Sequence, residues 1–298
     1  MKLTRPQFDI LLFLEQGKNG KNLTQRSIAR HTGLSIGTVN KTLVFLTENR
    51  LIKNTSLTAE GLKVLEPYRV RRAVFIAAGL GSRMIPITLN TPKPLIRVKG
   101  VRIIDTLLDA IYAADIDEIY IVRGYLSEQF DQLKYKYPSI RFLENPLYNE
   151  SNNISSMMCA RYLLQNAYVL DADLFLMNPG LITKYQYASN YLGVPVERTD
   201  DWCFETRHGI ISRFSLGGRN CYCWIGISYW NQADGAKLAD HVKQVYELPG
   251  GKECFWDQAA LQYFHEEYAV ELRECSFDDI IEIDTFNELK QLDETYRI

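Results

Sequence analysis

Apolar residues in the first fifty positions recur at helical spacing in three short runs. The first run covers 6–16 and follows Thr4, a good N-cap residue. A second run follows Thr24 and ends at Gly33, which can adopt the left-handed conformation that closes a helix. A third begins at Ser35 and keeps its apolar residues on one stripe. The pattern predicts three helices, the last two joined by a turn that contains glycine, which is the helix-turn-helix arrangement.

The stretch after the third predicted helix, LIKNTSLTAEGLKVL at 51–65, is interpreted as a short wing and a closing helix. With it, the first seventy residues resemble the winged helix-turn-helix domains of bacterial transcription regulators. This resemblance implies that the third helix enters the major groove of DNA. The candidate DNA contacts are Ser35, Thr38, Asn40 and Lys41 on that helix and Lys53 on the wing. The alternative is a trihelical packing module that has lost DNA binding and serves dimerisation.

The hydrophobic pattern changes after a polar and charged stretch at 66–72. An apolar, strand-like run begins at Val74, a helical pattern covers 103–113, and a buried strand follows near 118–122. Strand, helix and strand in this order predict a βαβ crossover on a parallel sheet, so the expected fold class is α/β. A further apolar strand is expected over 167–176.

Charge supports a domain boundary near Val70, which divides the chain into expected domains 1–70 and 71–298. Residues 1–70 carry eleven Lys and Arg against five Asp and Glu, a net charge of +6, whereas the remainder carries 23 against 31, a net charge of −8. Such an asymmetry predicts different partners for the two parts, with nucleic acid the candidate for the first. At 298 residues, the chain is long enough for two domains with their own cores.

The sequence gives no sign of an export signal or a membrane anchor. Asp9 interrupts the N-terminal apolar stretch and no small-residue cleavage site follows, so we expect a cytoplasmic protein without a membrane partner. The six cysteines include no CxxC pair, and the four histidines lack ligand spacing. Buried thiols are therefore favoured over a zinc site.

Two close glycines occur in the loop AGLGSRMIPITLNTPKPL at 78–95. A Walker loop would need GKS or GKT after four spacers, and a dinucleotide fingerprint would need a third glycine where Met84 stands. What remains is a loop whose backbone N–H groups wrap a nucleoside triphosphate. Arg83 and Lys93 would supply cations from the two ends of this loop.

The same loop closely resembles the signature of nucleotidyltransferases that form NDP-sugars and CDP-alcohols: GxG, Ser or Thr, Arg, Met or Leu, then Pro, Thr and Pro-Lys. This resemblance implies a Rossmann-like nucleotidyltransferase fold with a mostly parallel sheet. It also implies that Asp173 binds Mg²⁺ beside the phosphates, a role that suits a carboxylate at the end of a parallel strand. Asp171, two residues earlier, is expected to support the site without binding the metal.

The second half narrows the resemblance to bacterial CTP:phosphocholine cytidylyltransferases. The matching features, in order, are GYLSEQF at 124–130, NNISS at 152–156, DAD at 171–173, an isolated Trp202, GISYW at 226–230, FWDQ at 255–258 and IEID at 281–284. This resemblance implies that phosphocholine attacks CTP to give CDP-choline and pyrophosphate.

The same resemblance assigns roles to individual residues. Asp173 and Asp284 would hold Mg²⁺, Lys93 would contact the attacked phosphate, and Arg83 would hold the β and γ phosphates. Asp284 also precedes an expected helix at 286–292, where it is a candidate N-cap. The implied nucleotide-binding residues are Ala77, Ala78, Gly79, Gly81, Ser82, Arg83 and Asn153.

A quaternary ammonium cannot donate hydrogen bonds, so aromatic faces, often with a carboxylate nearby, select it. The candidate residues for binding it are Trp202, Trp230, Phe255, Trp256 and Asp257, whereas Trp224 is interpreted as an ordinary strand aromatic.

Several alternatives stay open. Phosphoethanolamine and 2-aminoethylphosphonate carry a primary ammonium, which prefers carboxylates and other hydrogen-bond acceptors. The preference for CTP among nucleoside triphosphates rests on the family likeness. A different class of function is a transcription regulator that senses CTP or CDP-choline without turnover. Winged-helix modules commonly pair to read two half-sites, which would make the protein a homodimer.

Overall fold

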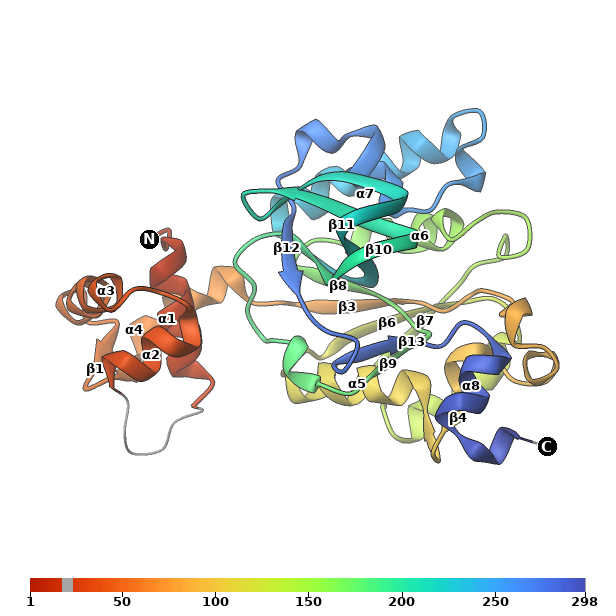
Figure 1. Ribbon diagram of the computed structural model, residues 1–298, viewed down its shortest axis with the longest axis horizontal. Coiled ribbons are helices and arrows are strands. Elements are labelled where there is room, and N and C mark those ends of the chain that lie inside the picture. The colour runs from red at the N-terminus through yellow and green to blue at the C-terminus, as the bar shows by residue number, and fades with distance from the viewer. Residues whose placement is uncertain (18–23, 298) are drawn as a thin grey trace. The chain divides into compact units, whose positions relative to one another are not determined.

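The computed structural model of the protein describes residues 1–17 and 24–297, and the chain divides into two compact units (Figure 1). Unit 1 comprises Met1–Arg69 and Tyr185–Tyr187, and unit 2 comprises Val70–Lys184 and Ala188–Ile298. Unit 1 thus ends one residue before the boundary expected from the sequence. It also includes three later residues that the sequence analysis had placed in the second domain.

Unit 1 contains the predicted helices and wing. Its elements are α1 (Arg5–Glu15), α2 (Gln25–Thr32), α3 (Ile36–Glu48), β1 (Ile52–Lys53), β2 (Ser56–Leu57) and α4 (Ala59–Leu65). Thr4, Thr24 and Ser35 are the N-caps of the first three helices, as predicted. The hydroxyls of Thr24 and Ser35 each accept a backbone N–H at 3.1 Å. Gly33 ends α2 with φ +69°, so its predicted left-handed conformation is confirmed.

The wing is a two-stranded hairpin, β1–β2, whose turn residues Asn54 and Thr55 both have positive φ. This backbone conformation matches the right-handed twist of the paired strands. Tyr187 brings the chain back into unit 1, where its hydroxyl donates to the Leu3 carbonyl at 3.2 Å. Its ring stacks on Tyr68 with centroids 5.6 Å apart. Residues 185–187 are therefore part of the core of unit 1.

Unit 2 is built on a seven-stranded sheet with the strand order β10-β12-β11-β8-β3-β6-β7. The strands of this sheet are β3 (Arg72–Ile76), β6 (Glu118–Arg123), β7 (Ile140–Glu144), β8 (Ala167–Asp171), β10 (Asn190–Arg207), β11 (Ile210–Trp230) and β12 (Glu271–Glu274). Unit 2 also contains two two-stranded sheets, formed by β4 (Arg97–Val98) with β5 (Val101–Arg102) and by β9 (Leu174–Leu176) with β13 (Ile280–Glu282). Strands β3, β6, β7 and β8 run parallel, whereas β11 is antiparallel to β8 and to β10. The predicted α/β class is confirmed.

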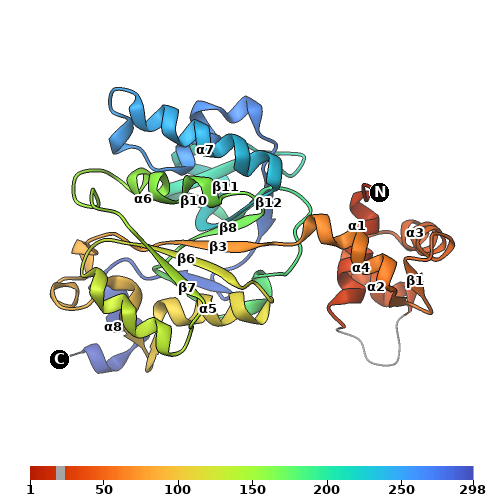
Figure 2. The same cartoon turned by 180° about the vertical axis from the view of Figure 1, so that it is seen from behind.

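Helices cover both faces of this sheet (Figure 2). They are α5 (Ile103–Ala113), α6 (Ile154–Ala160), α7 (Gln232–Glu247) and, beside β13, α8 (Phe286–Leu292). Alternation along β3 divides the core, because Phe75 packs in one cluster with α5 while Val74 packs in another with α6 and α7. In the described parts of the chain, no helix has the length and apolar character needed to span a membrane.

The predicted crossover helix corresponds to α5 and the strand after it to β6, with ends within one residue of those expected. The strand expected over 167–176 is instead interrupted. Strand β8 pairs with β3 as far as Asp171, and β9 then pairs with β13. Asp173 lies in the interruption, where its carbonyl accepts the N–H of Ile283 at 3.4 Å. The break therefore brings the aspartate pair beside the end of β13.

Candidate active site

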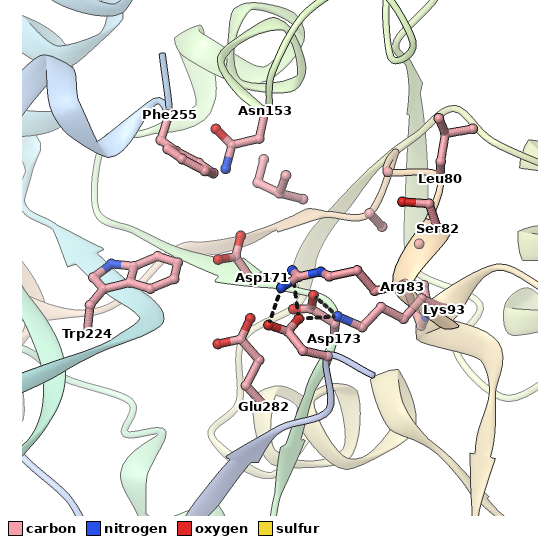
Figure 3. A pocket seen from close by; sticks show the side chains of 16 residues that line it. Leu80, Ser82, Arg83, Lys93, Asn153, Asp171, Asp173, Trp224, Phe255 and Glu282 are labelled. Carbon is pink, nitrogen blue, oxygen red and sulfur yellow. Dashed lines mark hydrogen bonds and ion pairs between the residues drawn. The ribbon is translucent and has the colours of Figure 1, made fainter. Parts of the chain in front are cut away.

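A cavity of about 340 Å³ lies at the carboxyl ends of β3 and β8 (Figure 3). The chain leaves β3 for β6 on one side, whereas β8 lies on the other side of β3. Ligands of open α/β sheets bind at such a switch in strand order. The cavity is lined by the glycine loop, by acidic residues from the ends of β8 and β13, and by two aromatic side chains.

The glycine loop is fixed by a tight turn at Gly81, whose φ is +63°. A Cβ atom there would lie 3.0 Å from the Thr88 methyl group and 3.2 Å from Cβ of Lys93, so the close approach requires glycine. The Thr88 hydroxyl donates to the Gly81 carbonyl at 2.9 Å and holds the turn. The loop thus presents Gly79 and Ser82 to the cavity.

Lys93 joins two carboxylates that are far away in sequence. Its Nζ lies 2.6 Å from Asp173 Oδ2 and 2.8 Å from Asp284 Oδ1. Arg83 contacts both oxygens of Asp284, at 2.8 and 3.0 Å, in the bidentate geometry of strong guanidinium–carboxylate pairs. Only 9% of the Lys93 side chain is exposed, whereas Arg83 is 66% exposed. Lys93 is therefore the buried centre of the network and Arg83 its solvent-facing end.

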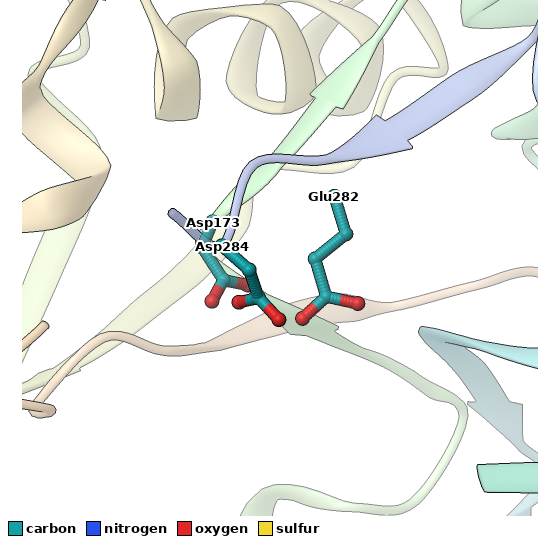
Figure 4. Close-up of side chains that lie close together, drawn as sticks. All are labelled: Asp173, Glu282 and Asp284. Carbon is teal, nitrogen blue, oxygen red and sulfur yellow. The ribbon is translucent and has the colours of Figure 1, made fainter. Parts of the chain in front are cut away.

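Three carboxylates could hold a cation beside this network. Asp173, Glu282 and Asp284 each offer an oxygen within 4.8 Å of the others (Figure 4). Asp173 Oδ1 is buried and has no hydrogen-bond partner among the described residues. An unpaired buried carboxylate oxygen is costly unless a ligand meets it, and clustered carboxylates are the ligands that Mg²⁺ prefers. The residues present therefore fit a bound Mg²⁺ ion.

The Asp284 side chain can bind a cation because it does not cap the following helix. Thr285 is the N-cap of α8, and its hydroxyl accepts the N–H of Glu288 at 3.2 Å. The Glu288 carboxylate in turn accepts the backbone N–H of Asp284 at 2.7 Å. The N-cap role considered for Asp284 is therefore wrong, and its side chain is directed to the cation network instead.

Protonation equilibria in the cavity follow from burial and neighbouring charge. Burial opposes a charge on Lys93, but the two aspartates outweigh it and raise the pKa of Lys93. Burial also opposes ionisation of Asp284, yet Lys93 and Arg83 lower the pKa of Asp284. Burial and nearby carboxylates raise the pKa of Asp171 and that of Glu282 well above their ordinary values. Asp173 and Asp284 are thus paired with cations, whereas Asp171 and Glu282 form no ion pair among the described residues.

Most of the residues expected to bind the nucleotide line this cavity. Asn153 is among them; its side-chain oxygen accepts the N–H of Trp256 at 2.9 Å, and its nitrogen faces the cavity in Figure 3. Ala77 also lines the cavity, but its N–H is bonded to the Val122 carbonyl. Ala78 does not line it. The lining residues from the expected nucleotide and catalytic sets are Ala77, Gly79, Gly81, Ser82, Arg83, Lys93, Asn153, Asp173 and Asp284.

The expected aromatic site differs from the observed one. Trp230, Trp256 and Asp257 are buried in the core and do not line the cavity. Trp202 also lies outside it, since it stacks on Phe214 with centroids 4.6 Å apart. Of the five expected residues, only Phe255 faces the cavity. Trp230 on β11 and Trp256 of the FWDQ segment pack against each other in the core, with ring centroids 6.1 Å apart.

Among the charged and aromatic lining residues, Trp224 and Glu282 were not assigned to the site from sequence, and Asp171 was expected only to support it. Glu282 could have been found by strand alternation, because it lies two positions before the expected metal ligand Asp284 and so faces the same side. Trp224 carries no comparable signal, since β11 contains other aromatic residues.

Comparisons with known proteins agree with this geometry. Residues 73–198 match the MobA-like NTP transferase domain, and residues 4–73 match the Firmicute plasmid replication protein family RepL. The chain is 35% identical over 228 residues to the 2-aminoethylphosphonate cytidylyltransferase of Lancefieldella rimae, which covers 75% of this chain and 92% of that protein.

Similarity to choline-phosphate enzymes is comparable. The chain is 31% identical over 232 residues to the choline-phosphate cytidylyltransferase of Streptococcus pneumoniae, covering 75% of this chain and 97% of that one. The solved structure of the CTP:phosphocholine cytidylyltransferase from Streptococcus pneumoniae superimposes with a TM-score of 0.70 at 29% identity, covering 76% and 99% of the two chains. The predicted nucleotidyltransferase fold is confirmed, and the winged-helix region has a match of its own.

Proposed function

Because this chain belongs to the cytidylyltransferases of the MobA-like NTP transferase family, we propose that it transfers the cytidylyl group of CTP to a small phosphate or phosphonate that bears a cationic nitrogen. Phosphocholine is the acceptor predicted from the sequence. The observation that supports transfer is the convergence of Arg83, Lys93, Asp173 and Asp284 on one cavity. A binding site without catalysis would not need both cations and the acidic cluster together.

The reaction is a substitution at phosphorus. An oxygen of the acceptor phosphate attacks the α-phosphorus of CTP, a new P–O bond forms, and the bond to the bridging oxygen of the β-phosphate breaks to release pyrophosphate. No residue has to remove a proton, because a phosphate or phosphonate is already anionic at neutral pH. The protein contributes orientation and charge neutralisation.

Named residues of the cavity supply these contributions. Lys93, on the floor of the cavity, neutralises the attacked phosphate, and Arg83 with the N–H groups of the glycine loop holds the β and γ phosphates. Asp173 and Asp284 would hold Mg²⁺, with Glu282 near enough to be a third ligand. When bound, the ion would neutralise charge on the phosphates. Asn153 is assigned to the base and ribose.

Two acceptors are supported by different observations. Similarity to the pneumococcal enzyme, in sequence and in structure, favours phosphocholine. Similarity to the Lancefieldella enzyme favours 2-aminoethylphosphonate. Both molecules carry a cationic nitrogen two carbons from the oxygen or phosphorus of their acidic group, so one cavity can be tested with both.

A pyrophosphate-release assay with CTP, Mg²⁺ and each acceptor tests the proposal. We expect pyrophosphate with at least one acceptor, and about a 10²- to 10³-fold lower rate for Lys93→Met. Lys99→Met is the matched control, because Lys99 is exposed and outside the cavity lining. CTP binding without pyrophosphate from any acceptor would instead support the regulator alternative.

We also propose that unit 1 binds DNA. Support comes from its winged-helix elements, its net positive charge and the match to a plasmid replication protein family. Asn40, Lys41 and Lys53 are exposed on α3 and the wing, as a DNA-binding surface requires. The hydroxyl groups of Ser35 and Thr38 form a hydrogen bond of 2.9 Å with each other. To contact DNA, these hydroxyls would have to form further hydrogen bonds or give up this one.

Fluorescence anisotropy with a labelled 30-base-pair duplex, at several salt concentrations, tests this second proposal. Lys41→Ala should weaken binding and reduce the salt dependence by about one phosphate contact. Lys63→Ala is the control, because Lys63 lies on α4 and not on α3, is exposed, and is paired with Glu60 of the same helix. If the anisotropy does not change even at low salt, the result would favour the alternative that unit 1 is a packing module without DNA binding.

A further inference from the structure

Asp171 has no assigned role in nucleotide or metal binding, and Glu282 has so far been given only that of a third ligand of the Mg²⁺ ion. Asp171 ends β8, and Glu282 ends β13. Figure 3 shows both carboxylates between the Trp224 ring and the side chains of Arg83 and Lys93. The cavity therefore has a cationic end for phosphates and an acidic end bordered by aromatic rings.

The acidic end lacks a cation of its own. Asp173 and Asp284 are paired with Lys93, and Asp284 also with Arg83. Within the described residues, neither Asp171 nor Glu282 forms an ion pair, and no group donates a hydrogen bond to the Asp171 carboxylate. Two carboxylates that are partly removed from water are unfavourable without a positive partner. A positive partner for this end can come from the acceptor, because no described cation forms an ion pair with either carboxylate.

The position of Asp171 is fixed by the neighbouring strand. A Cβ atom added to Gly226 on β11 would lie 2.2 Å from Asp171 Oδ2 and 2.8 Å from its Cγ. Only glycine at 226 leaves room for the carboxylate, so the side chain lies directly against the backbone of β11. Asp171 is thus a positioned acceptor of hydrogen bonds rather than a solvated surface acid.

The ring surfaces at this end are too few for a cage. Trp224 and Phe255 are the two aromatic side chains that line the cavity, and the expected cage residues Trp202, Trp230 and Trp256 lie outside it. A quaternary ammonium relies on aromatic faces because it has no N–H group. A primary ammonium has three N–H donors, which can form charge-assisted hydrogen bonds to carboxylates.

We propose that Asp171 and Glu282 bind the ammonium group of the acceptor, with Trp224 and Phe255 beside it, and that they select a primary ammonium over a quaternary one. The preferred acceptor is then a two-carbon amine that carries a phosphate or phosphonate. This inference rests on the proposed cytidylyl transfer, and it reverses the order of acceptors expected from the sequence. Asp171 and Glu282 act by binding substrate and do not take part in the substitution at phosphorus.

The first test uses the unaltered protein and a methylation series. Phosphoethanolamine, its N-methyl and N,N-dimethyl derivatives and phosphocholine keep one positive charge while the number of N–H donors falls from three to none. We expect kcat/KM for pyrophosphate release to fall along the series, by about 30-fold or more from first to last. A 2-aminoethylphosphonate arm shows whether the enzyme takes the phosphonate or the phosphate ester.

The second test removes one carboxylate charge at a time. Asp171→Asn and Glu282→Gln should each raise KM for phosphoethanolamine or 2-aminoethylphosphonate about tenfold or more and flatten the methylation series. CTP affinity, measured by calorimetry with Mg²⁺, should change less than KM for the acceptor. Asp200→Asn is the matched control, because its side chain is 88% exposed on β10.

The outcomes separate the two proposals. If pyrophosphate is released and phosphocholine equals or exceeds the primary amines, the acidic pair does not select N–H donors and this inference fails, while cytidylyl transfer stands. If the methylation series is unchanged in both Asp171→Asn and Glu282→Gln, this inference also fails while cytidylyl transfer stands. If no acceptor yields pyrophosphate although CTP binds, cytidylyl transfer itself fails and the inference fails with it.

Discussion

Asp257 provides a stability prediction that is independent of catalysis. It is 1% exposed, and the hydroxyl of the buried Tyr191 donates to its Oδ1. Burial raises the pKa of Asp257 to about 7, although the hydrogen bond from Tyr191 acts in the opposite direction. Asp257→Asn keeps an acceptor for Tyr191 and nearly the same volume, but it removes the group that ionises.

The size of the effect follows from the two pKa values. The folded state holds the proton up to about pH 7, whereas an unfolded aspartate releases it near pH 3.8. The group's stabilising contribution is therefore complete below pH 3.8 and is lost as the pH rises through 7. The loss relative to a residue that cannot ionise is about 1.5 kcal/mol at pH 5 and about 4 kcal/mol at pH 8. The stability gained by Asp257→Asn should grow by about 2.5 kcal/mol between these pH values.

Tryptophan fluorescence during urea unfolding can measure this difference. All four tryptophans, at positions 202, 224, 230 and 256, belong to unit 2, so the signal reports on the unit that contains Asp257. Asp240→Asn on α7 is the control, since it removes an exposed charge of the same kind. Equal stability differences at pH 5 and pH 8 would refute the reasoning, because they would mean that Asp257 is ionised in the folded protein throughout this range.

Three further predictions concern the cavity and unit 1. Lys93→Met should lower kcat/KM for CTP in pyrophosphate release by about 10²- to 10³-fold, and an unchanged value would remove Lys93 from the phosphate site. Chelation of divalent cations should weaken CTP binding by tenfold or more in calorimetry, because Lys93 would then stay paired with Asp173 and Asp284 and neutralise less of the charge on the phosphates. Gly61→Ala should destabilise unit 1 by more than about 2 kcal/mol, since the added Cβ would lie 2.1 Å from the Leu51 carbonyl oxygen. Amide hydrogen exchange of unit 1 measures this destabilisation, and unchanged protection would contradict the packing.

Local signals predicted the parts of the fold that depend on neighbours in sequence. Thr24 and Ser35 cap helices because a short hydroxyl side chain there accepts a free N–H of the first turn, a rule that needs no tertiary information. The glycine loop was equally readable, because the missing third glycine excluded one class of loop and the spacing of Arg83 and Lys93 indicated another.

Side-chain direction in unit 2 could not be predicted in the same way. Trp230 is inside the core and Trp224, six positions earlier on β11, lines the cavity, although both positions have the same parity. The register shifts within the β10–β11 pairing break simple alternation, and nothing in the local sequence marks them. The burial of Asp257 beside Tyr191 likewise depends on a contact between residues 66 positions apart.

The charge balance of the cavity links its two ends. Four carboxylates, from Asp171, Asp173, Glu282 and Asp284, face two cations, Arg83 and Lys93, so the ionised cavity is short of two positive charges. In the protein alone, Lys93 is engaged with Asp173 and Asp284 and cannot serve a phosphate at full strength. A divalent cation held by those two aspartates would leave Lys93 available to the phosphates of CTP. Asp171 at the other end would still have no ion-pair partner after that exchange, so under the proposed acceptor binding a cationic acceptor would complete the site better than one of the same size without positive charge.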